Sequence, residues 1–337
     1  MLRSPWGLLL GSLLFSLAVG SAGVGRAGGA SEVRVLLYDA AEPVRVGSLR
    51  SPRAIQLSGA HQLLIEGVGR VARWHPEGSG PWQVGSQRVR GRIAVRAREG
   101  RIQVLNRVAL EDYVASTVGG EMAPSWPEEA LRAQAVATRT YVLHEAAKRR
   151  NVDWDVRATA TSQVYGGMRA ETRETRAAAR ATRGEVLTYG GELILAVFHS
   201  TAGGRTATAG EVWGEDRPYL RVVDVEDEDD APHTYWRAEL KRPDLEAALA
   251  LAGISVGRIE KVAVADRSES GRVRRLSVRG VGGRASLRGR DLRSLLGNLE
   301  LRSTLFEIRE IGGGYAFVGS GYGHGVGMSQ WGARSMA

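Results

Sequence analysis

The sequence of 337 residues contains no cysteine. Without thiols the protein forms neither disulfides nor thiolate zinc sites, and a cysteine nucleophile is excluded. Lysine is nearly absent as well, since it occurs only at Lys148, Lys241 and Lys261, so arginine carries almost all of the positive charge. We attribute this preference first to the codon supply of a GC-rich genome and second to ligand chemistry.

The remaining composition is that of a globular protein, with 43% hydrophobic and 25% charged residues and a formal net charge of +9. This mixture excludes a disordered, collagen-like or multi-span membrane chain. The length allows one large hydrophobic core or two modest ones. The 44 glycines indicate many tight turns or surfaces lined by backbone.

Residues 1–30 are typical of a secretory signal peptide or an N-terminal anchor. Arg3 precedes an apolar run over 6–19, which is shorter than a comfortable bilayer span. Small residues that signal peptidase accepts follow at Gly20, Ala22, Ala27 and Ala30. Because no cysteine follows the run, a lipoprotein anchor is excluded. We therefore expect a secreted or extracytoplasmic protein that touches the membrane only through this segment. Its positive charge would face wall polymers and lipid headgroups, not nucleic acid.

The rest of the chain predicts an α+β fold of largely antiparallel strands with packed helices. We expect a β-rich N-terminal region over 31–90 and a mixed core over 91–337, without a long linker or an internal repeat. Strand-like runs occupy 33–38, 54–57, 61–68, 92–97, 101–106, 185–200, 258–265, 272–280 and 284–288. The acidic run 225–230 is expected to be a solvated loop.

Helix signals are sharper than strand signals in this sequence. A short helix over 110–118 is expected to stop at Gly119 and Gly120, and a second is expected over 126–149 with Ser125 as its N-cap. Further helices are expected over 172–182, 243–253 and 289–296. Common catalytic motifs are absent: the glycines near the C-terminus do not form GxGxxG or a P-loop, and no GxSxG occurs.

Three stretches carry residues suited to chemistry. Glu121 lies between a glycine pair and Pro124, near Met122 and Trp126, and an apolar neighbourhood would raise its pKa as a general acid requires. A solvated loop glutamate is the simpler alternative.

The other two stretches contain histidines. His199 and Ser200 end a strand-like run, for which an incidental turn is the alternative. His324 is flanked by glycines and followed by Gln330 and Trp331, which suits a sugar-binding groove, whereas a glycine-rich hairpin is the alternative.

Taken in order, these stretches resemble the stage II sporulation protein D family, also called the amidase-enhancer family. The resemblance covers about residues 90–337. It rests on 104–114 (VLNRVALEDYV), 120–141 (GEMAPSWPEEALRAQAVATRTY), 162–167 (SQVYGG), 199–204 (HSTAGG), 212–214 (VWG) with 218–220 (PYL), 301–306 (LRSTLF) and 323–333 (GHGVGMSQWGA). The resemblance implies action on bacterial peptidoglycan outside the cytoplasm. Some members resemble lytic transglycosylases, and the catalytic glutamate of the family falls on Glu121.

The chemistry agrees with a single carboxylic acid. A glycosidase of the usual kind needs a second carboxylate, whereas a transglycosylase uses the sugar's own 6-hydroxyl as nucleophile, so one glutamate can serve as acid and then as base. Asp153, Asp155 and Asp224 stay open as second carboxylates, which would favour hydrolysis.

We assign the remaining positions to substrate binding. His199, Ser200, His324 and Gln330 would hold or polarise the sugar, and Arg139 and Gln134 would hydrogen-bond the cavity wall. The aromatic candidates for the groove are Trp126, Tyr165, Trp213 and Trp331, with core packing as the alternative role for at least half of them.

Two departures from the family pattern matter. Some relatives bind zinc through cysteines near the block at 162–165, where this chain has Thr159 and Thr161, so we expect no metal or other cofactor, with a weaker site at His199 and His324 as the alternative. The chain also ends at Ala337, where relatives continue, which predicts a C-terminal truncation. Two other functions stay open: a non-enzymatic wall-binding enhancer of a separate N-acetylmuramoyl-L-alanine amidase, and a metal-dependent amidase that uses the two histidines.

Overall fold

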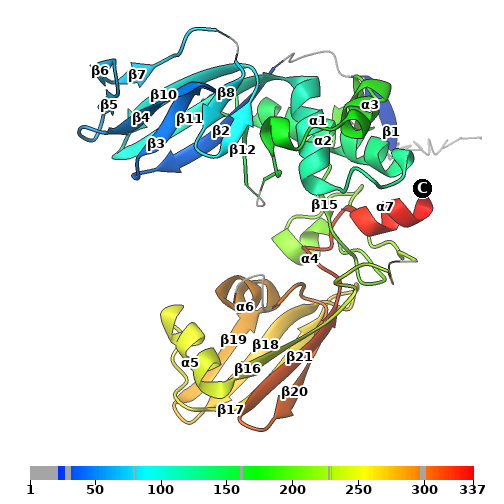
Figure 1. The fold of residues 1–337 in the computed structure, drawn as a ribbon. Helices are drawn as coiled ribbons and strands as arrows, with labels where there is room; N and C mark the ends of the chain where they lie inside the picture. The colour runs from blue at the N-terminus through cyan, green and yellow to red at the C-terminus, as the bar shows by residue number, and fades with distance from the viewer. Residues whose placement is uncertain are drawn as a thin grey trace, which may run out of the picture.

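A computed structural model describes residues 22–26, 32–78, 80–159, 162–226, 228, 230–296 and 301–337. Figure 1 shows two bodies, one built from the N-terminal half of the chain and one from residues around 235–320, joined by a smaller region that holds α4, β15 and α7. Each body has its own hydrophobic core. Most strand pairs are antiparallel, so the predicted α+β class is confirmed.

Two sheets form the strand-rich side of the N-terminal body. The first has the order β12 (Val156–Arg157), β2 (Glu32–Ala40), β11 (Arg101–Ala109), β10 (Arg92–Arg98) and β7 (Arg73–Trp74). The second has the order β6 (Gly69–Val71), β5 (Leu63–Ile65), β4 (Ser51–Leu57), β3 (Val44–Ser48), β8 (Trp82–Val84) and β9 (Gln87–Val89). Since β2 pairs with β11, the regions before and after residue 90 share a sheet, and the predicted division at that residue stays a prediction.

Helices cover the other side of this body. They are α1 (Leu110–Glu121), α2 (Glu128–Lys148) and α3 (Arg173–Ala181), with a 3-10 turn at Gly167–Arg169. The helix expected over 172–182 is confirmed as α3. Thr172 and Thr175 form the capping box at its start. The expected N-cap of α2 was wrong: the helix begins at Glu128 after Pro127, which provides no side-chain cap.

A small sheet lies against these helices. It contains β1 (Ala22–Arg26), β13 (Glu185–Tyr189) and β14 (Glu192–Leu193), and β1 pairs antiparallel with β13. Most of the predicted leader over 1–30 lies outside the described residues, but its residues 22–26 are part of this sheet. Among the described residues, no helix is long and apolar enough to cross a membrane.

The C-terminal body packs two three-stranded sheets with two helices. One sheet has the order β16 (Tyr235–Lys241), β21 (Gly314–Ser320) and β20 (Phe306–Ile311), and the other β17 (Ile259–Arg267), β18 (Val273–Gly280) and β19 (Gly283–Arg288). The helices are α5 (Arg242–Leu251) and α6 (Gly289–Leu296). The elements expected between 243 and 296 are confirmed within two residues at nearly every end, because each carries a clear hydrophobic period.

The joining region departs most from expectation. The single strand-like run over 185–200 forms three short strands, the last of which is β15 (Phe198–His199). After β21, the glycine-rich end forms β22 (Met328–Ser329) and then α7 (Gln330–Met336), a helix that the sequence pattern did not indicate. Here β15 pairs in parallel with β22, while α4 (Ala209–Trp213) lies toward the C-terminal body.

Candidate active site

Glu121 is the last residue of α1 and is only partly exposed. Its Oε1 accepts a hydrogen bond from the backbone N–H of Val164, at 2.7 Å. Burial raises the pKa of the Glu121 carboxyl above its ordinary value of 4.5, and the Val164 N–H and the amide of Gln330 oppose the rise only in part. The carboxyl is therefore set up to hold a proton at higher pH than a solvated glutamate.

The glycine pair before Glu121 has a packing role. A Cβ on Gly119 would lie 1.9 Å from the carbonyl oxygen of Ala170, and one on Gly120 would lie 2.2 Å from that of Val164. The expectation that α1 stops at these glycines was wrong, because they continue the helix and let the 164–170 loop approach it. This close approach brings the Val164 N–H to the glutamate.

Gln330 joins Glu121 to the end of the chain. It is the first residue of α7 and is 6% exposed. Its Nε2 donates to the backbone oxygen of Glu121 and to Oε1 of Gln134 on α2, both at 3.4 Å. The structure thus places two amide side chains from distant segments beside the glutamate.

An aromatic pair lies at the same end of α7. Trp126 and Trp331 meet edge to face with ring centroids 4.9 Å apart, and both are partly exposed. The guanidinium of Arg334 lies 4.6 Å from the Trp331 ring centroid and 5.7 Å from that of Trp126. Arg334 was missed by sequence reasoning, although its position three residues after Trp331 on a helix would have indicated the contact.

The two histidines lie together with Trp213. The ring centroids of His199 and His324 are 5.5 Å apart, and those of Trp213 and His324 are 5.2 Å apart. His199 Nδ1 lies 3.1 Å from the carbonyl oxygen of Val326, which can only accept, so this nitrogen carries the proton. His324 Nδ1 accepts from the Val326 N–H at 3.1 Å.

Both imidazoles are neutral near pH 7. Burial lowers the pKa of His199 well below its ordinary value, with the neighbouring His324 and Arg272 adding to the effect. Burial lowers the pKa of His324 to about 4, helped by Arg293. The pair can therefore donate or accept hydrogen bonds but does not titrate in the physiological range.

A short parallel bridge ties the histidines to Gln330. His199 pairs with Ser329, and the N–H of Trp331 donates to the carbonyl oxygen of Ser200 at 3.1 Å. Ser200, predicted to bind substrate, thus uses its backbone to position α7. The glutamate and histidine groups are linked through two adjacent residues, Ser329 and Gln330.

Glu228 is a buried residue near the site whose structural role sequence reasoning missed. The run 225–230 was expected to be a solvated loop, but Glu228 is only 4% exposed. Its carboxylate accepts the backbone N–H groups of Ala202 and Gly203, both at 2.9 Å, and of Gly204 at 3.4 Å. The hydroxyl of Ser329 donates to it as well. The prediction of a solvated loop was wrong at Glu228, because the backbone N–H groups of the loop after His199 need a hydrogen-bond acceptor.

Comparison with known proteins identifies the family. The sequence model described as stage II sporulation protein matches residues 98–189, and a second, described as a domain of unknown function, matches residues 223–327. A stage II sporulation protein D from Bacillus amyloliquefaciens is 33% identical over 252 residues, which cover 69% of this chain and 70% of that protein. The chain belongs to the stage II sporulation protein D family. The resemblance seen in the sequence is confirmed.

Two other relatives match this chain over only part of their own length. An uncharacterized protein of Brachyspira hyodysenteriae is 34% identical over 235 residues, covering 69% of this chain but 62% of that protein. A Bacillus subtilis protein named amidase enhancer is 29% identical over 268 residues, covering 65% of this chain and 37% of the relative. The chain therefore spans less than two thirds of the length of either protein.

Two of the predicted substrate-binding residues of this stage II sporulation protein D family member lie inside the fold. Arg139 is fully buried, and its Nε and Nη2 bind both carboxylate oxygens of Glu111, at 3.0 and 2.7 Å. It also donates to the carbonyl oxygens of Ala179 and Glu185. Tyr165 stacks on Tyr113 with ring centroids 5.3 Å apart. These contacts give both side chains a structural role.

The three carboxylates considered as partners of Glu121 are engaged elsewhere. Asp155 is buried against Arg34 at 2.6 Å, and Asp153 binds Arg96 at the N-terminal sheet. Asp224 is exposed and pairs with Arg205 at 2.7 Å. Each of these three aspartates has an arginine as its ion-pair partner.

Zinc, which the family resemblance brings into question, does not fit the donors present. Within the described residues, no group of three or more histidine, aspartate or glutamate side chains could hold a metal ion. His199 and His324 lie together, but the Nδ1 lone pair of His324 already accepts from the Val326 N–H, so this imidazole has no free lone pair for a metal ion.

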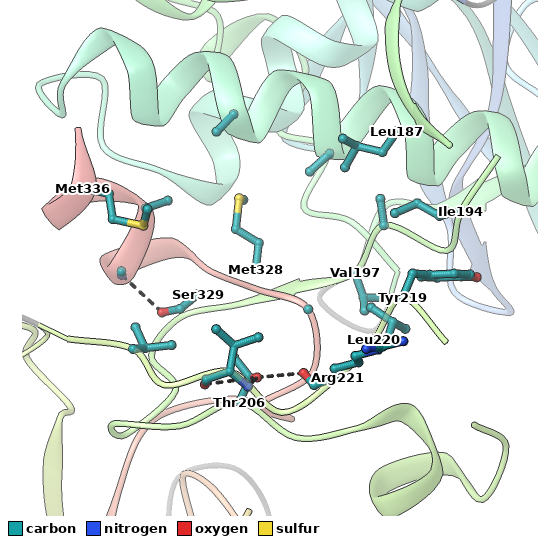
Figure 2. Close-up of a pocket in the computed structure, with 18 of the residues that line it drawn as sticks. Leu187, Ile194, Val197, Thr206, Tyr219, Leu220, Arg221, Met328, Ser329 and Met336 are labelled. Atoms are coloured by element: carbon teal, nitrogen blue, oxygen red, sulfur yellow. Dashed lines mark hydrogen bonds between the residues drawn. The ribbon is translucent and has the colours of Figure 1, made fainter. Parts of the chain in front are cut away.

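Two large cavities flank the joining region, and neither has Glu121 in its lining. The first, of about 1100 Å³, lies between α2, β13 and α7 and is mostly apolar. Figure 2 shows Leu187, Ile194 and Tyr219 on one side of it and Met328 and Met336 on the other. The second, of about 650 Å³, contains Trp213, His324 and six arginines: Arg272, Arg274, Arg275, Arg288, Arg290 and Arg293.

Proposed function

We propose that this protein cleaves the glycan strands of bacterial peptidoglycan, outside the cytoplasm, as a lytic transglycosylase. The observation that carries the proposal is the setting of Glu121: one partly buried carboxyl, with a raised pKa, held by a backbone N–H and flanked by Gln330. Membership of the stage II sporulation protein D family supports it.

The reaction needs one group that first donates and then accepts a proton. Protonated Glu121 would donate its proton to the glycosidic oxygen as the bond between N-acetylmuramic acid and N-acetylglucosamine breaks. The resulting carboxylate would then take the proton of the muramic 6-hydroxyl as this oxygen closes on the anomeric carbon. The products are an anhydro-muramic end and a new glucosamine end, and no water is consumed.

Substrate contacts would come from groups that converge on Glu121. Trp126 and Trp331 offer aromatic faces, and Gln330 and Gln134 offer amide hydrogen bonds, a combination suited to sugars. With the three aspartates engaged by arginines, the arrangement favours internal attack over hydrolysis.

The test compares the full-length protein with Glu121→Gln on intact and on peptide-stripped glycan strands, with products read by mass spectrometry. We expect anhydro-muramic ends from the wild type and a loss of about a thousandfold in the variant, because general acid catalysis contributes about that factor. Glu128→Gln is the matched control, since Glu128 is an exposed glutamate seven residues away that pairs with Arg132 on the surface of α2. Reducing muramic ends, or full activity in Glu121→Gln, would contradict the proposal.

A second function has one observation in its favour, the similarity to a relative named amidase enhancer. In this alternative the protein would bind the wall and stimulate a separate amidase without cutting glycan itself. Stimulation of an added amidase by Glu121→Gln to the same extent as by wild type, with no anhydro ends from either protein, would establish it.

A further inference from the structure

A cleft rich in arginine separates α4 from the C-terminal body. Its walls are α4, the strands β18 and β19 and the helix α6, and its volume is about 650 Å³. Six arginines line it against two acids, Glu211 and Asp291. We infer that this cleft binds a carboxylate carried by the wall glycan, an inference that rests on the proposed function and assigns a second binding site for its substrate.

Arg272 gives the cleft a buried cation that no described carboxylate contacts directly. Burial lowers the pKa of Arg272 to about 10, and the charges of Glu211 and Glu228 oppose this shift only in part. The side chain is 3% exposed, and its Nη1 and Nη2 donate to the backbone oxygens of Arg205 and Ala202, at 2.9 and 2.8 Å. Within the described ranges it makes no ion pair, and its buried Nε has no partner. Removing a charge from water is costly without compensation, so a bound anion would stabilise this arrangement.

The backbone around Arg272 is shaped to hold its guanidinium. Gly325 has a φ of +81°, and a Cβ there would lie 2.3 Å from Nη2 of Arg272. A glycine is therefore required both by the backbone angle and by the contact. The guanidinium plane is fixed between this glycine and the two carbonyl oxygens, which makes Arg272 a rigid element of the wall.

The other groups of the cleft leave positive charge in excess. The carboxylate of Glu211 accepts the N–H and the hydroxyl of Ser270, and Asp291 pairs with Arg288 at 2.7 Å. Arg293, half-buried, donates from Nε to the Leu301 carbonyl oxygen at 2.9 Å and makes no ion pair with any described residue. Arginine presents a planar fork that matches a carboxylate, so a carboxylate ligand fits this wall.

Trp213 and His324 add a surface for a sugar ring. Trp213 is 40% exposed at the end of α4, and its ring lies against the neutral imidazole of His324. An aromatic face beside guanidinium groups suits a sugar that carries an acid, whereas a free inorganic anion would not need it.

Wall glycan supplies carboxylates from two sources. In peptide-stripped strands each muramic acid has a free lactyl carboxylate. In intact strands this group is an amide and the stem peptide carries its own carboxylates. A chain of N-acetylglucosamine has the same sugar backbone without any acid, so it is a matched neutral probe for the cleft.

The experiment measures the dissociation constants of three tetrasaccharides for the full-length Glu121→Gln protein, which prevents turnover, by calorimetry. The probes are tetra-N-acetylglucosamine, a peptide-stripped wall tetrasaccharide and its peptide-bearing counterpart. We expect an acidic probe to bind about tenfold more tightly than the neutral one, because a charge-assisted hydrogen bond contributes about that factor. The acidic probe that binds more tightly identifies the source of the carboxylate.

Arginine variants then locate the binding. Arg293→Gln should weaken the acidic probe about tenfold and leave the neutral one within about twofold. Arg309→Gln is the matched control, because Arg309 lies on β20, outside the cleft, with a side chain that is 66% exposed. If Arg293→Gln unfolds at a lower temperature than its parent, the exposed pair Arg274→Gln and Arg275→Gln replaces it in the test.

Equal affinities for the neutral and acidic probes would overturn the inference, as would equal effects of Arg293→Gln and Arg309→Gln. These results are separable from the test of cleavage. Anhydro ends without selectivity for acidic probes would support the transglycosylase proposal and contradict carboxylate binding in the cleft. Selective binding of acidic probes without anhydro ends would support carboxylate binding in the cleft and contradict the transglycosylase proposal.

Discussion

Arg139 in the N-terminal body and Arg272 in the C-terminal body are both buried guanidinium groups, but only Arg139 contacts a carboxylate directly. Glu111 binds Arg139 through both of its oxygens, whereas Arg272 is held by two backbone oxygens and makes no ion pair among the described residues. The same type of side chain thus forms a direct ion pair in one region and is a buried cation without one in the other.

Two glutamates, one buried and one partly buried, show the same contrast. Glu228 receives three backbone N–H groups and a hydroxyl, while Glu121 receives one backbone N–H with the Gln330 amide nearby. Charged side chains with a full set of hydrogen-bond or ion-pair partners stabilise the fold. Charged side chains with fewer partners can still bind a ligand or a proton. This difference separates structural from functional charges here better than burial does.

The largest loss of stability should come from breaking the ion pair between Arg139 and Glu111. Arg139→Met should lower the free energy of unfolding by about 3–5 kcal/mol, because it leaves the Glu111 carboxylate without its partner. Arg272→Met is the matched variant and should cost about 1 kcal/mol, since it frees two carbonyl oxygens but also removes an unpaired charge. Urea unfolding measures both, and equal losses would contradict the contrast between the two arginines.

A smaller loss should follow neutralisation of Glu228. Glu228→Gln keeps the shape but replaces charge-assisted hydrogen bonds from Ala202 and Gly203 by weaker ones, so we expect a loss of about 2 kcal/mol. Urea unfolding again measures it, with Glu226→Gln as the neighbouring control. A loss below about 0.5 kcal/mol, the usual range for a surface substitution, would show that the buried carboxylate is not needed.

The smallest predicted change is a gain in stability, on neutralisation of Glu121. Because the pKa of Glu121 lies above its ordinary 4.5 in the folded state, the wild type loses stability as pH rises from 4.5 through the folded pKa. Glu121→Gln should therefore melt at a higher temperature than wild type near pH 7, and the two should converge below about pH 4. Calorimetry across this range measures the difference, and a lower melting temperature for the variant at pH 7 would refute the assignment.

Sequence patterns predicted the regular elements well where a hydrophobic period was long, as over 259–296. They failed where one contact overrides local preference. Gly119 and Gly120 indicate a helix end, but a loop from far along the chain requires them inside the helix. Glu228 lies in an acidic run, and such a composition predicts a solvent-exposed loop. The N–H groups that Glu228 binds belong to residues about 25 positions earlier, which the local composition does not reveal.

Some residues of the candidate site were likewise predicted from the sequence, and others were not. Glu121 was identified from its motif, and the structure brings it together with Gln330, Trp126 and Trp331. Arg139 could not be assigned from the sequence alone, because its partner Glu111 lies 28 residues away on another helix. The cleft around Arg272 escaped notice, since its arginines were part of a bias attributed to codon supply.

The pairing of β22 with β15 has a consequence for the order of events during synthesis. The fully buried residues of both hydrophobic cores all precede residue 328, but Gln330 reaches Glu121 only after the last residues of the fold have been made. Contacts of such long sequence separation form late in folding. A chain interrupted shortly before β22 would lack Gln330 and Trp331, so the group of residues around Glu121 is assembled only when this last segment is present.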